Sequence, residues 1–280
     1  MHKQMKKYFP IFVLPTLVAF IIAFLIPFIM GIYLSFCKFT TIVDAEFVGV
    51  KNYVEMFQQR DFLKALQFTT GFTLISVITI NVFAFLLAIA LTRNIKGTNI
   101  YRTTFFMPNL IGGIVLGYIW QLIINGVLLR WGVTIVSDAK YGFIGLVVLM
   151  NWQMIGYMMV IYIAGIQGIS PDLIEAAKID GATKMQTLKR IMIPMVMPSF
   201  TICLFLTLTN SFKLFDQNLA LTAGAPGRKT QMLALDIYNT FYGRTGWEGV
   251  GQAKAVIFFL IVGIIAFIQL RATRSKEVQN

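Results

Sequence analysis

The chain has 280 residues, of which 57% are hydrophobic and only 13% are charged. Soluble domains carry about 25% charged residues, so this composition excludes an ordinary soluble protein. The net charge of +12 lies beside apolar runs and therefore indicates membrane topology rather than nucleic-acid binding. The two cysteines are far apart and the single histidine is His2, which excludes a disulfide framework and a zinc site built from histidine and cysteine.

Six stretches contain no Asp, Glu, Lys or Arg, namely 8–37, 65–92, 103–129, 141–171, 191–212 and 255–270. A helix needs about 20 mainly apolar residues to cross a membrane, and the first five stretches are long enough. The sixth is short, so its span is expected to start near Gly249. We therefore predict one all-α integral membrane domain over 1–280, with spans at approximately 9–36, 67–92, 104–126, 142–167, 191–212 and 249–270.

The predicted orientation follows from the basic residues. Six spans place both termini on one side, and Lys and Arg are densest in the short segments 1–8, 92–103, 168–190 and 271–280. Because short cytoplasmic loops carry an excess of basic residues, we expect both termini in the cytoplasm. The remaining segments then face outward, with a short amphipathic element over 50–57 on the outer surface and a helical pattern over 230–241.

The third span contains two glycines four residues apart, Gly113 and Gly117. This spacing leaves one helix face without side chains, so another helix backbone can approach closely. We interpret the pair as a packing feature rather than a functional site.

Lys254 lies inside the sixth span, a turn or two below one membrane surface. We expect its ammonium to snorkel to the lipid headgroups. The alternative is that Lys254 faces a watery cavity between helices.

The loop at 170–190 has the strongest local pattern in the chain. Ser170 is a typical helix N-cap and Pro171 suits the first helical position, so a short helix is expected to start there. Asp180 and Gly181 form a turn signal that ends this helix. A second helix is expected from about Thr183, and the start of the fifth span should be bent, because its prolines at 194 and 198 cannot donate backbone hydrogen bonds.

The short helix is thin, because it carries Ala176 and Ala177 with Glu175 and Asp180 at its flanks. A thin helix can lie in a groove of another protein. It could equally be an amphipathic helix on the membrane surface, and the pattern alone leaves both possibilities open.

The same loop resembles a known signature, the EAA loop of the membrane subunits of bacterial ABC importers. The resemblance rests on Glu175-Ala176-Ala177, Asp180-Gly181-Ala182, Ile191, Pro194 and Pro198, at the spacing of that family. It extends over all six spans, and Phe215-Asp216, the segment 221–227 and the segment 238–241 are similar to the carbohydrate-importer branch, close to the maltose-type permeases. Two features depart from that family: fewer consecutive glycines around Gly224, and Lys254 where a small residue is usual.

The resemblance implies a type I (MetI-like) permease fold and a coupling role for the loop at 170–190. A separate ATPase dimer would grip the short helix, and the residues implied in coupling are Glu175, Ala176, Ala177, Asp180 and Gly181. It further implies a second permease subunit in a heterodimer, an extracellular solute-binding protein, a carbohydrate substrate, and a place in the bacterial cytoplasmic membrane with both termini in the cytoplasm.

The substrate pathway is expected among polar and aromatic residues of spans four and five, because sugar sites pair aromatic faces with amides and hydroxyls. The resemblance places Tyr157, Thr207 and Ser211 at pocket-lining positions of maltose-type subunits. The full set of candidates is Asn151, Trp152, Tyr157, Thr207, Asn210 and Ser211. Polar residues in spans also serve simply to hydrogen-bond neighbouring helices, so this structural interpretation stays open.

Two alternative functions remain open from the sequence. The same machine could import glycerol-3-phosphate or a polyol, which would be favoured by Lys254 or Arg130 in the cavity. An ATP-independent secondary transporter would need intramembrane carboxylates for coupling ions, and the six charge-free runs contain none. The sequence has no Gly-x-x-x-x-Gly-Lys-[Ser/Thr] loop, so we expect neither nucleotide hydrolysis nor any other enzymatic activity in this chain, and no cofactor.

Overall fold

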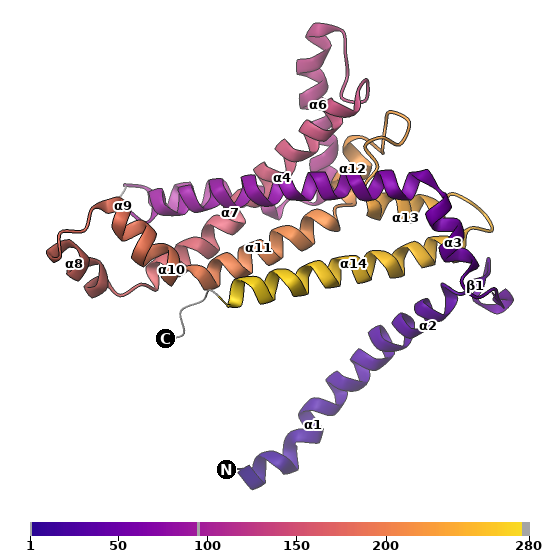
Figure 1. The fold of residues 1–280 in the computed structure, drawn as a ribbon, viewed down its shortest axis with the longest axis horizontal. Coiled ribbons are helices and arrows are strands. Elements are labelled where there is room, and N and C mark those ends of the chain that lie inside the picture. Colours follow the sequence, from indigo (N-terminus) through magenta and orange to yellow (C-terminus); the bar gives the residue numbers. More distant parts are fainter. Residues whose placement is uncertain (1, 94–95, 276–280) are drawn as a thin grey trace. The chain divides into compact units, whose positions relative to one another are not determined.

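The computed structural model describes residues 2–93 and 96–275 and is almost entirely helical (Figure 1). Residues 1, 94–95 and 276–280 belong to basic segments predicted to face the cytoplasm, and they lie outside the described residues. Among the described residues, the only sheet pairs β1 (Cys37–Lys38) with β2 (Glu46–Phe47) in antiparallel register. The predicted all-α class is therefore confirmed apart from this short hairpin.

The helices follow one another along the chain with short connections. The first part contains α1 (His2–Phe20), η1 (Ile21–Leu25), α2 (Ile26–Leu34), η2 (Ile42–Asp44), α3 (Lys51–Gln58) and α4 (Arg60–Leu91). The middle contains α5 (Thr98–Phe106), η3 (Met107–Leu110), α6 (Gly113–Leu128), η4 (Leu129–Trp131), α7 (Ala139–Gln167) and α8 (Pro171–Ile179). The last part contains α9 (Lys184–Thr187), η5 (Leu188–Met192), α10 (Ile193–Met195), α11 (Met197–Phe212), α12 (Asp216–Leu221), α13 (Leu233–Phe241) and α14 (Glu248–Arg274).

Five helical stretches of the described chain are long and apolar enough to cross a membrane. They are Ile11–Leu34, Arg60–Leu91, Gly113–Trp131, Ala139–Gln167 and Glu248–Arg274. The pair Lys184–Met195 and Met197–Phe212 makes a sixth if it is one bent span, and its two halves meet at 67°. The predicted bend at the start of the fifth span is present, with Pro194 in α10 and Pro198 in the first turn of α11.

The third span differs from the sequence prediction. A single helix was expected over 104–126, but α5 ends at Phe106 and α6 begins only at Gly113. Pro108 lies in the intervening η3, and Ile111 and Gly112 have extended ψ angles of 131° and 138°. Pro108 has no N–H to donate to the preceding turn, and the chain becomes extended at Ile111 and Gly112, so the α-helix does not continue through this segment.

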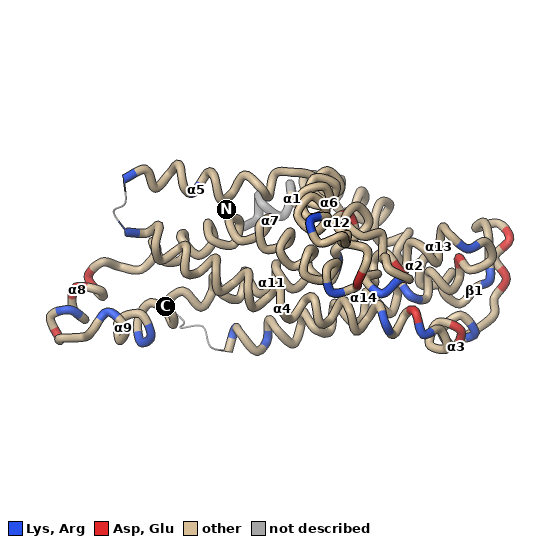
Figure 2. Tube along the Cα trace, turned by 90° about the horizontal axis from the view of Figure 1, so that it is seen from above, with Lys and Arg blue, Asp and Glu red and all other residues tan. Residues whose placement is uncertain are grey.

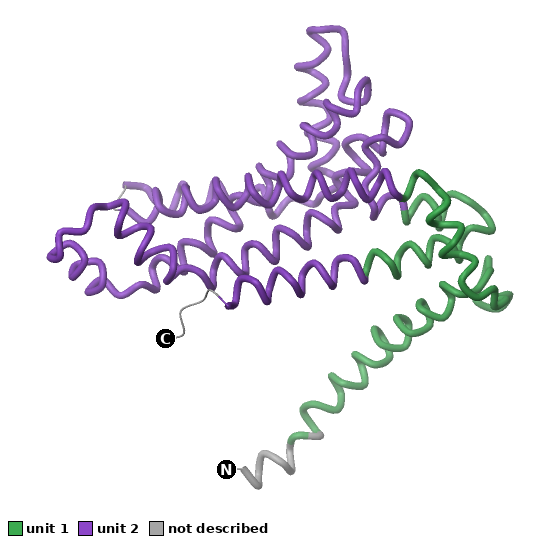
Figure 3. Tube along the Cα trace, viewed as in Figure 1, with its two compact units in different colours: residues 1–62, 237–259 green, residues 63–236, 260–280 purple. Residues whose placement is uncertain are grey.

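The described contacts group the chain into two compact units (Figure 3). Unit 1 comprises Met1–Phe62 and Ile237–Phe259, and unit 2 comprises Leu63–Asp236 and Leu260–Asn280. In unit 1, Asp44 accepts hydrogen bonds from the backbone N–H groups of Thr41 (2.7 Å) and Thr40 (3.1 Å). These bonds favour the ionised carboxylate and hold the pKa of Asp44 below its ordinary value.

Lys254 of α14 is fully buried in the structure, with 0% of its surface exposed. In unit 1 its Nζ donates to Thr240 Oγ1 at 2.8 Å and to Gln59 Oε1 at 3.5 Å, and it lies 6.0 Å from the ring centroid of Phe62. The prediction that Lys254 snorkels to the headgroups is therefore wrong, and the alternative of a water-exposed cavity fails for the same reason. The polar groups of the protein itself solvate this ammonium.

Unit 2 is built around α7, which has the largest share of buried residues among the long helices. Tyr162 is fully buried there, and its ring centroid lies 5.4 Å from that of Phe85 and 4.8 Å from that of Phe200. The Tyr162 hydroxyl donates to Asn81 Oδ1 at 2.7 Å. These contacts join α4, α7 and α11 into the bundle that carries the candidate site.

The glycines of α6 pack against α12 within unit 2. A Cβ atom on Gly117 would lie 2.6 Å from the Cβ of Ala220, and one on Gly113 would lie 2.7 Å from the Cβ of Asp216. Both distances are too short for a real contact, so only glycine permits this approach. The interpretation of the glycine pair as a packing feature is confirmed, and the packing places α12 beside the pocket described next.

Candidate functional site

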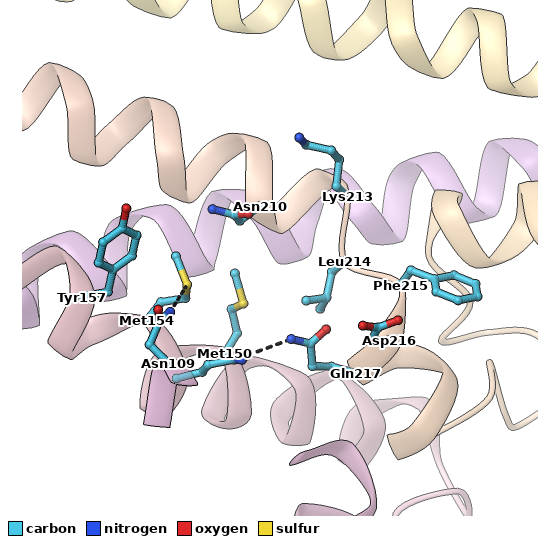
Figure 4. Close-up of a pocket in the computed structure, with 11 residues that line it drawn as sticks. Asn109, Met150, Met154, Tyr157, Asn210, Lys213, Leu214, Phe215, Asp216 and Gln217 are labelled. Atoms are coloured by element: carbon cyan, nitrogen blue, oxygen red, sulfur yellow. Dashed lines mark hydrogen bonds between the residues drawn. The ribbon is translucent and has the colours of Figure 1, made fainter. Parts of the chain in front are cut away.

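A pocket of about 450 Å³ lies inside unit 2 (Figure 4). It is an open pocket lined by residues of η3, α7, α11, the turn after α11, and α12. Its lining consists of Asn109, Met150, Gln153, Met154, Tyr157, Asn210, Lys213, Leu214, Phe215, Asp216 and Gln217. This volume is within the range of about 300–1,000 Å³ that is typical of small-molecule sites.

Side-chain amides provide most of the polar lining. Gln217 Nε2 donates to Gln153 Oε1 at 2.8 Å, and Gln153 Nε2 donates to the carbonyl of Ile111 at 3.3 Å. Asn210 Nδ2 donates to the carbonyl of Leu206 at 2.9 Å in its own helix. Amides both donate and accept hydrogen bonds, so this lining suits a polyhydroxylated molecule.

The charged lining is balanced, since Lys213 supplies one cation and Asp216 one carboxylate. Figure 4 shows Asp216 beside Gln217 and the Lys213 side chain pointing away from them, while Tyr157 lies at the opposite end. Tyr157 adds an aromatic face and a hydroxyl, and Met150 and Met154 add adaptable apolar surface between the two ends. The pocket therefore combines an aromatic group, amides and no net charge.

The structure brings two of the six predicted pathway residues, Tyr157 and Asn210, into this lining. Thr207 is fully buried, accepts from Asn81 Nδ2 at 3.0 Å and donates to the carbonyl of Cys203 at 2.7 Å. Its contacts are those of a residue that joins α11 to α4. The structure thus supports the helix-packing interpretation for Thr207.

The other three predicted residues are also outside the lining. Ser211 is fully buried, and its hydroxyl has no hydrogen-bond partner within residues 2–93 and 96–275. Trp152 is 43% exposed and packs against Trp120 with ring centroids 5.6 Å apart. Asn151 Nδ2 donates to the carbonyl of Val147 at 2.8 Å.

Several lining residues were not predicted from the sequence. Asn109 follows Pro108 at the unexpected helix break, so its position could not be read from a continuous span. Lys213 lies in the turn after α11, and Asp216 and Gln217 are the first residues of α12. Gln153 was the one residue whose place in the lining the sequence could have indicated, because it is a polar residue on the same apolar span as Tyr157.

The predicted coupling loop adopts the expected helix–turn–helix. The helix α8 starts at Pro171 with Ser170 at its N-cap position, although the Ser170 side chain makes no capping hydrogen bond. Gly181 has φ +77°, which suits glycine at the end of a helix. Thr183 then caps α9, since its Oγ1 accepts from the N–H of Gln186 and its own N–H donates to Gln186 Oε1.

A groove of about 480 Å³ lies between α8 and α9 in unit 2. Four of the five predicted coupling residues line it, namely Ala176, Ala177, Asp180 and Gly181. Glu175 is exposed and is not part of this lining. Leu173, which also lines the groove, and Ile179 are 44% and 86% exposed, so α8 presents apolar side chains.

Charge is distributed unevenly in unit 2. Figure 2 shows Lys and Arg at the ends of α4 and α5 near residues 93 and 96 and along the α8–α9 loop, while the middle of α7 and α11 carries no charge. Arg102 of α5 donates from Nη2 to the carbonyl of Leu91 at 2.9 Å, at the end of α4. This distribution agrees with a membrane-embedded middle and a polar end that carries α8.

Known proteins match this chain over most of its length. Residues 80–276 match the family described as binding-protein-dependent transport system inner membrane component. The probable starch degradation products transport system permease protein AmyD of Thermoanaerobacterium thermosulfurigenes is 47% identical, over 96% of this chain and 94% of the relative. The sn-glycerol-3-phosphate transport system permease protein UgpA of Brucella abortus biovar 1 is 30% identical, over 97% of this chain and 96% of the relative.

A solved structure shows the same fold. A chain in the crystal structure of a bacterial ABC transporter involved in the import of the acidic polysaccharide alginate superposes with a TM-score of 0.83 at 19% identity, covering 98% of both chains. The predicted fold of an ABC importer permease is therefore confirmed. The chain belongs to the family of inner membrane components of binding-protein-dependent transport systems, and it is a multi-pass membrane permease component.

Proposed function

We propose that this chain is a permease subunit of an ABC importer that moves a sugar or oligosaccharide across the cytoplasmic membrane. The observation that carries the proposal is the pocket inside unit 2, lined by amides, Tyr157, one cation and one carboxylate, in a chain of this transport family. The 47% identity to a permease named for starch degradation products supports the same class of cargo.

The glycerol-3-phosphate alternative has weaker support from the pocket. That alternative predicted Lys254 or Arg130 in the cavity, and the pocket lining contains neither. Lys213 does line the pocket, but Asp216 lines it too. A phosphate dianion needs an excess of positive partners, whereas a neutral sugar matches a lining without net charge.

The coupling part of the proposal assigns α8 to contact with a separate ATPase dimer. The support is a short helix with exposed apolar residues and a turn fixed by Gly181 at positive φ. Closure of the ATPase dimer would move α8 as a rigid lever, and the spans would shift between states that open the pocket to one side or the other. Glu175, Ala176, Ala177, Asp180 and Gly181 are the proposed coupling residues.

The proposed assembly contains further partners. A second, different permease subunit would complete the membrane part, and an extracellular solute-binding protein would deliver the sugar. Both termini would lie in the cytoplasm, as the basic segments beside the spans indicate. The energy for transport would come from ATP hydrolysis on the separate subunit.

Sugar uptake by vesicles that contain the assembled transporter tests the pocket assignment. Asn210→Ala and Tyr157→Phe should each lower uptake severalfold at limiting sugar, because each removes a polar group from the lining. Thr209→Ala is the matched control, since Thr209 neighbours Asn210, hydrogen-bonds only within its own helix among the described residues and does not line the pocket. Equal uptake by the Asn210 and Thr209 variants would remove Asn210 from the substrate pathway.

A further inference from the structure

The surface helix α3 carries an exposed apolar stripe. Val50 at its N-cap position, Val54 and Phe57 are 63%, 50% and 52% exposed. Their spacing of four and three residues places them on one side of the helix, in a continuous row. Soluble surfaces rarely expose such a row, so the stripe calls for an apolar environment outside the described chain.

The opposite face of α3 is fixed to the end of the first span. Asn52 is 5% exposed, and its Nδ2 donates to the carbonyl of Ser35 at 2.9 Å and to that of Cys37 at 2.8 Å. The hydroxyls of Tyr53 and Ser35 form a further hydrogen bond of 2.6 Å. Ser35 is the C-cap residue of α2, so α3 lies level with the end of the span Ile11–Leu34.

Two more span ends meet the same helix. Gln59 alone separates α3 from α4, and the membrane-spanning helix α4 begins at Arg60. In the first turn of α14, a Cβ atom on Gly249 would lie 2.7 Å from Nδ2 of Asn52. Since the ends of membrane spans lie at the boundary between hydrocarbon and water, all three contacts place α3 at that boundary.

The charged side of α3 is separate from the apolar stripe. Lys51 and Glu55 face each other with 4.0 Å between Nζ and Oε1, and their side chains are 67% and 37% exposed. At about 100° per residue, Lys51 lies about 60° and Glu55 about 100° around the helix from Val54. The helix thus has a face toward the protein, a charged face and an apolar face, which is the pattern of helices that lie in a membrane interface.

We propose that α3 is an interfacial helix whose stripe of Val50, Val54 and Phe57 inserts into the outer leaflet of the lipid bilayer. Lipid fits better than a docking protein, because the stripe lies level with three span ends. A soluble partner would approach from the water side, where Lys51 and Glu55 are exposed. The inserted helix would hold the connection between the first span and α4 at a fixed depth, independently of the transported cargo.

Spin labels on the full chain, assembled with its partner subunits in lipid nanodiscs, test this proposal. Val54→Cys places a label on the stripe, and Glu55→Cys is the matched control one residue away. The two native cysteines are buried, so the unmodified chain should take up little label and serves as the background. Phe57→Cys provides a second stripe position if the Val54 variant does not assemble.

The ratio of label accessibility to molecular oxygen over an aqueous nickel complex should be severalfold higher at 54 and 57 than at 55, because oxygen concentrates in hydrocarbon. An equal ratio at all three positions would overturn the proposal. It would also be overturned if the stripe labels were immobile and shielded from both reagents, or if they became so only after addition of the solute-binding protein. Either result would show that protein rather than lipid covers the stripe.

Discussion

Lys254 is a cation in the interior of the protein, and its ammonium donates hydrogen bonds to polar groups of unit 1, Thr240 and Gln59 among them. Its hydrogen bonds to Thr240 and Gln59 tie α14 to α13 and to the residue between α3 and α4. The ring of Phe62 adds a cation–π contact at 6.0 Å. A buried charge with such partners holds the elements that carry them together, and removal of one partner is destabilising because a buried polar or charged group then loses its interaction.

Replacement of Lys254 by alanine should lower the free energy of unfolding by about 1–3 kcal/mol, because it leaves buried hydrogen-bonding groups unsatisfied. The unfolding temperature of the purified protein in detergent measures this. Lys64→Ala is the control, since Lys64 is exposed on α4 and its loss should change stability by less than about 0.5 kcal/mol. Equal unfolding temperatures of the two variants would contradict a structural role for Lys254.

The candidate pocket shows which residues could be predicted from sequence. Tyr157 and Asn210 were predicted as pathway residues and do line the pocket. Thr207 was predicted too, but it does not line the pocket, and its hydroxyl accepts a hydrogen bond from Asn81. Spans four and five are apolar on all sides, so the sequence contains no pattern that tells the pocket face from the packing face. That distinction arises only from tertiary packing, and it also explains why the burial of Lys254 was not predicted.

At the scale of elements, α8 and its turn were predicted well because their signals are local. Pro171 starts the helix, and Gly181 at φ +77° ends it. The break between α5 and α6 was missed, although Pro108 and Gly112 lie within it. Membrane helices tolerate both residue types, so a proline in an apolar run does not by itself predict where a helix stops.

Gly181→Val should reduce ATP-dependent uptake severalfold without loss of the protein from the membrane. A Cβ atom at this position would meet nothing within 4 Å, so the effect would come from the backbone alone. The left-handed backbone conformation costs a β-branched residue roughly 1–2 kcal/mol of conformational free energy. The substitution should therefore change the conformation of the turn that sets the orientation of α8. Uptake and the amount of protein in the membrane fraction are the two measurements.

Gly181→Asn is the matched control for that variant, because asparagine tolerates the left-handed conformation better than valine. It should retain more uptake than Gly181→Val. If both variants transported as well as the unchanged chain, the conformation of this turn would have no part in coupling.

At the scale of the whole molecule, the fold and the family could be predicted because the resemblance covers all six spans. The match of residues 80–276 to the transport family and the TM-score of 0.83 with a chain of an alginate ABC transporter agree with that prediction. The basic residues beside the spans and the charge-free middle of α7 and α11 follow from the same membrane physics.

The most direct test of the central claim, that a separate ATPase drives this permease, is sugar uptake by proteoliposomes of defined composition. Uptake should require the ATPase subunit, ATP, the second permease and the solute-binding protein together, and should stop when any one is left out. The chain reconstituted alone should transport nothing. Sugar uptake by this chain alone, in the absence of ATP, would contradict the account.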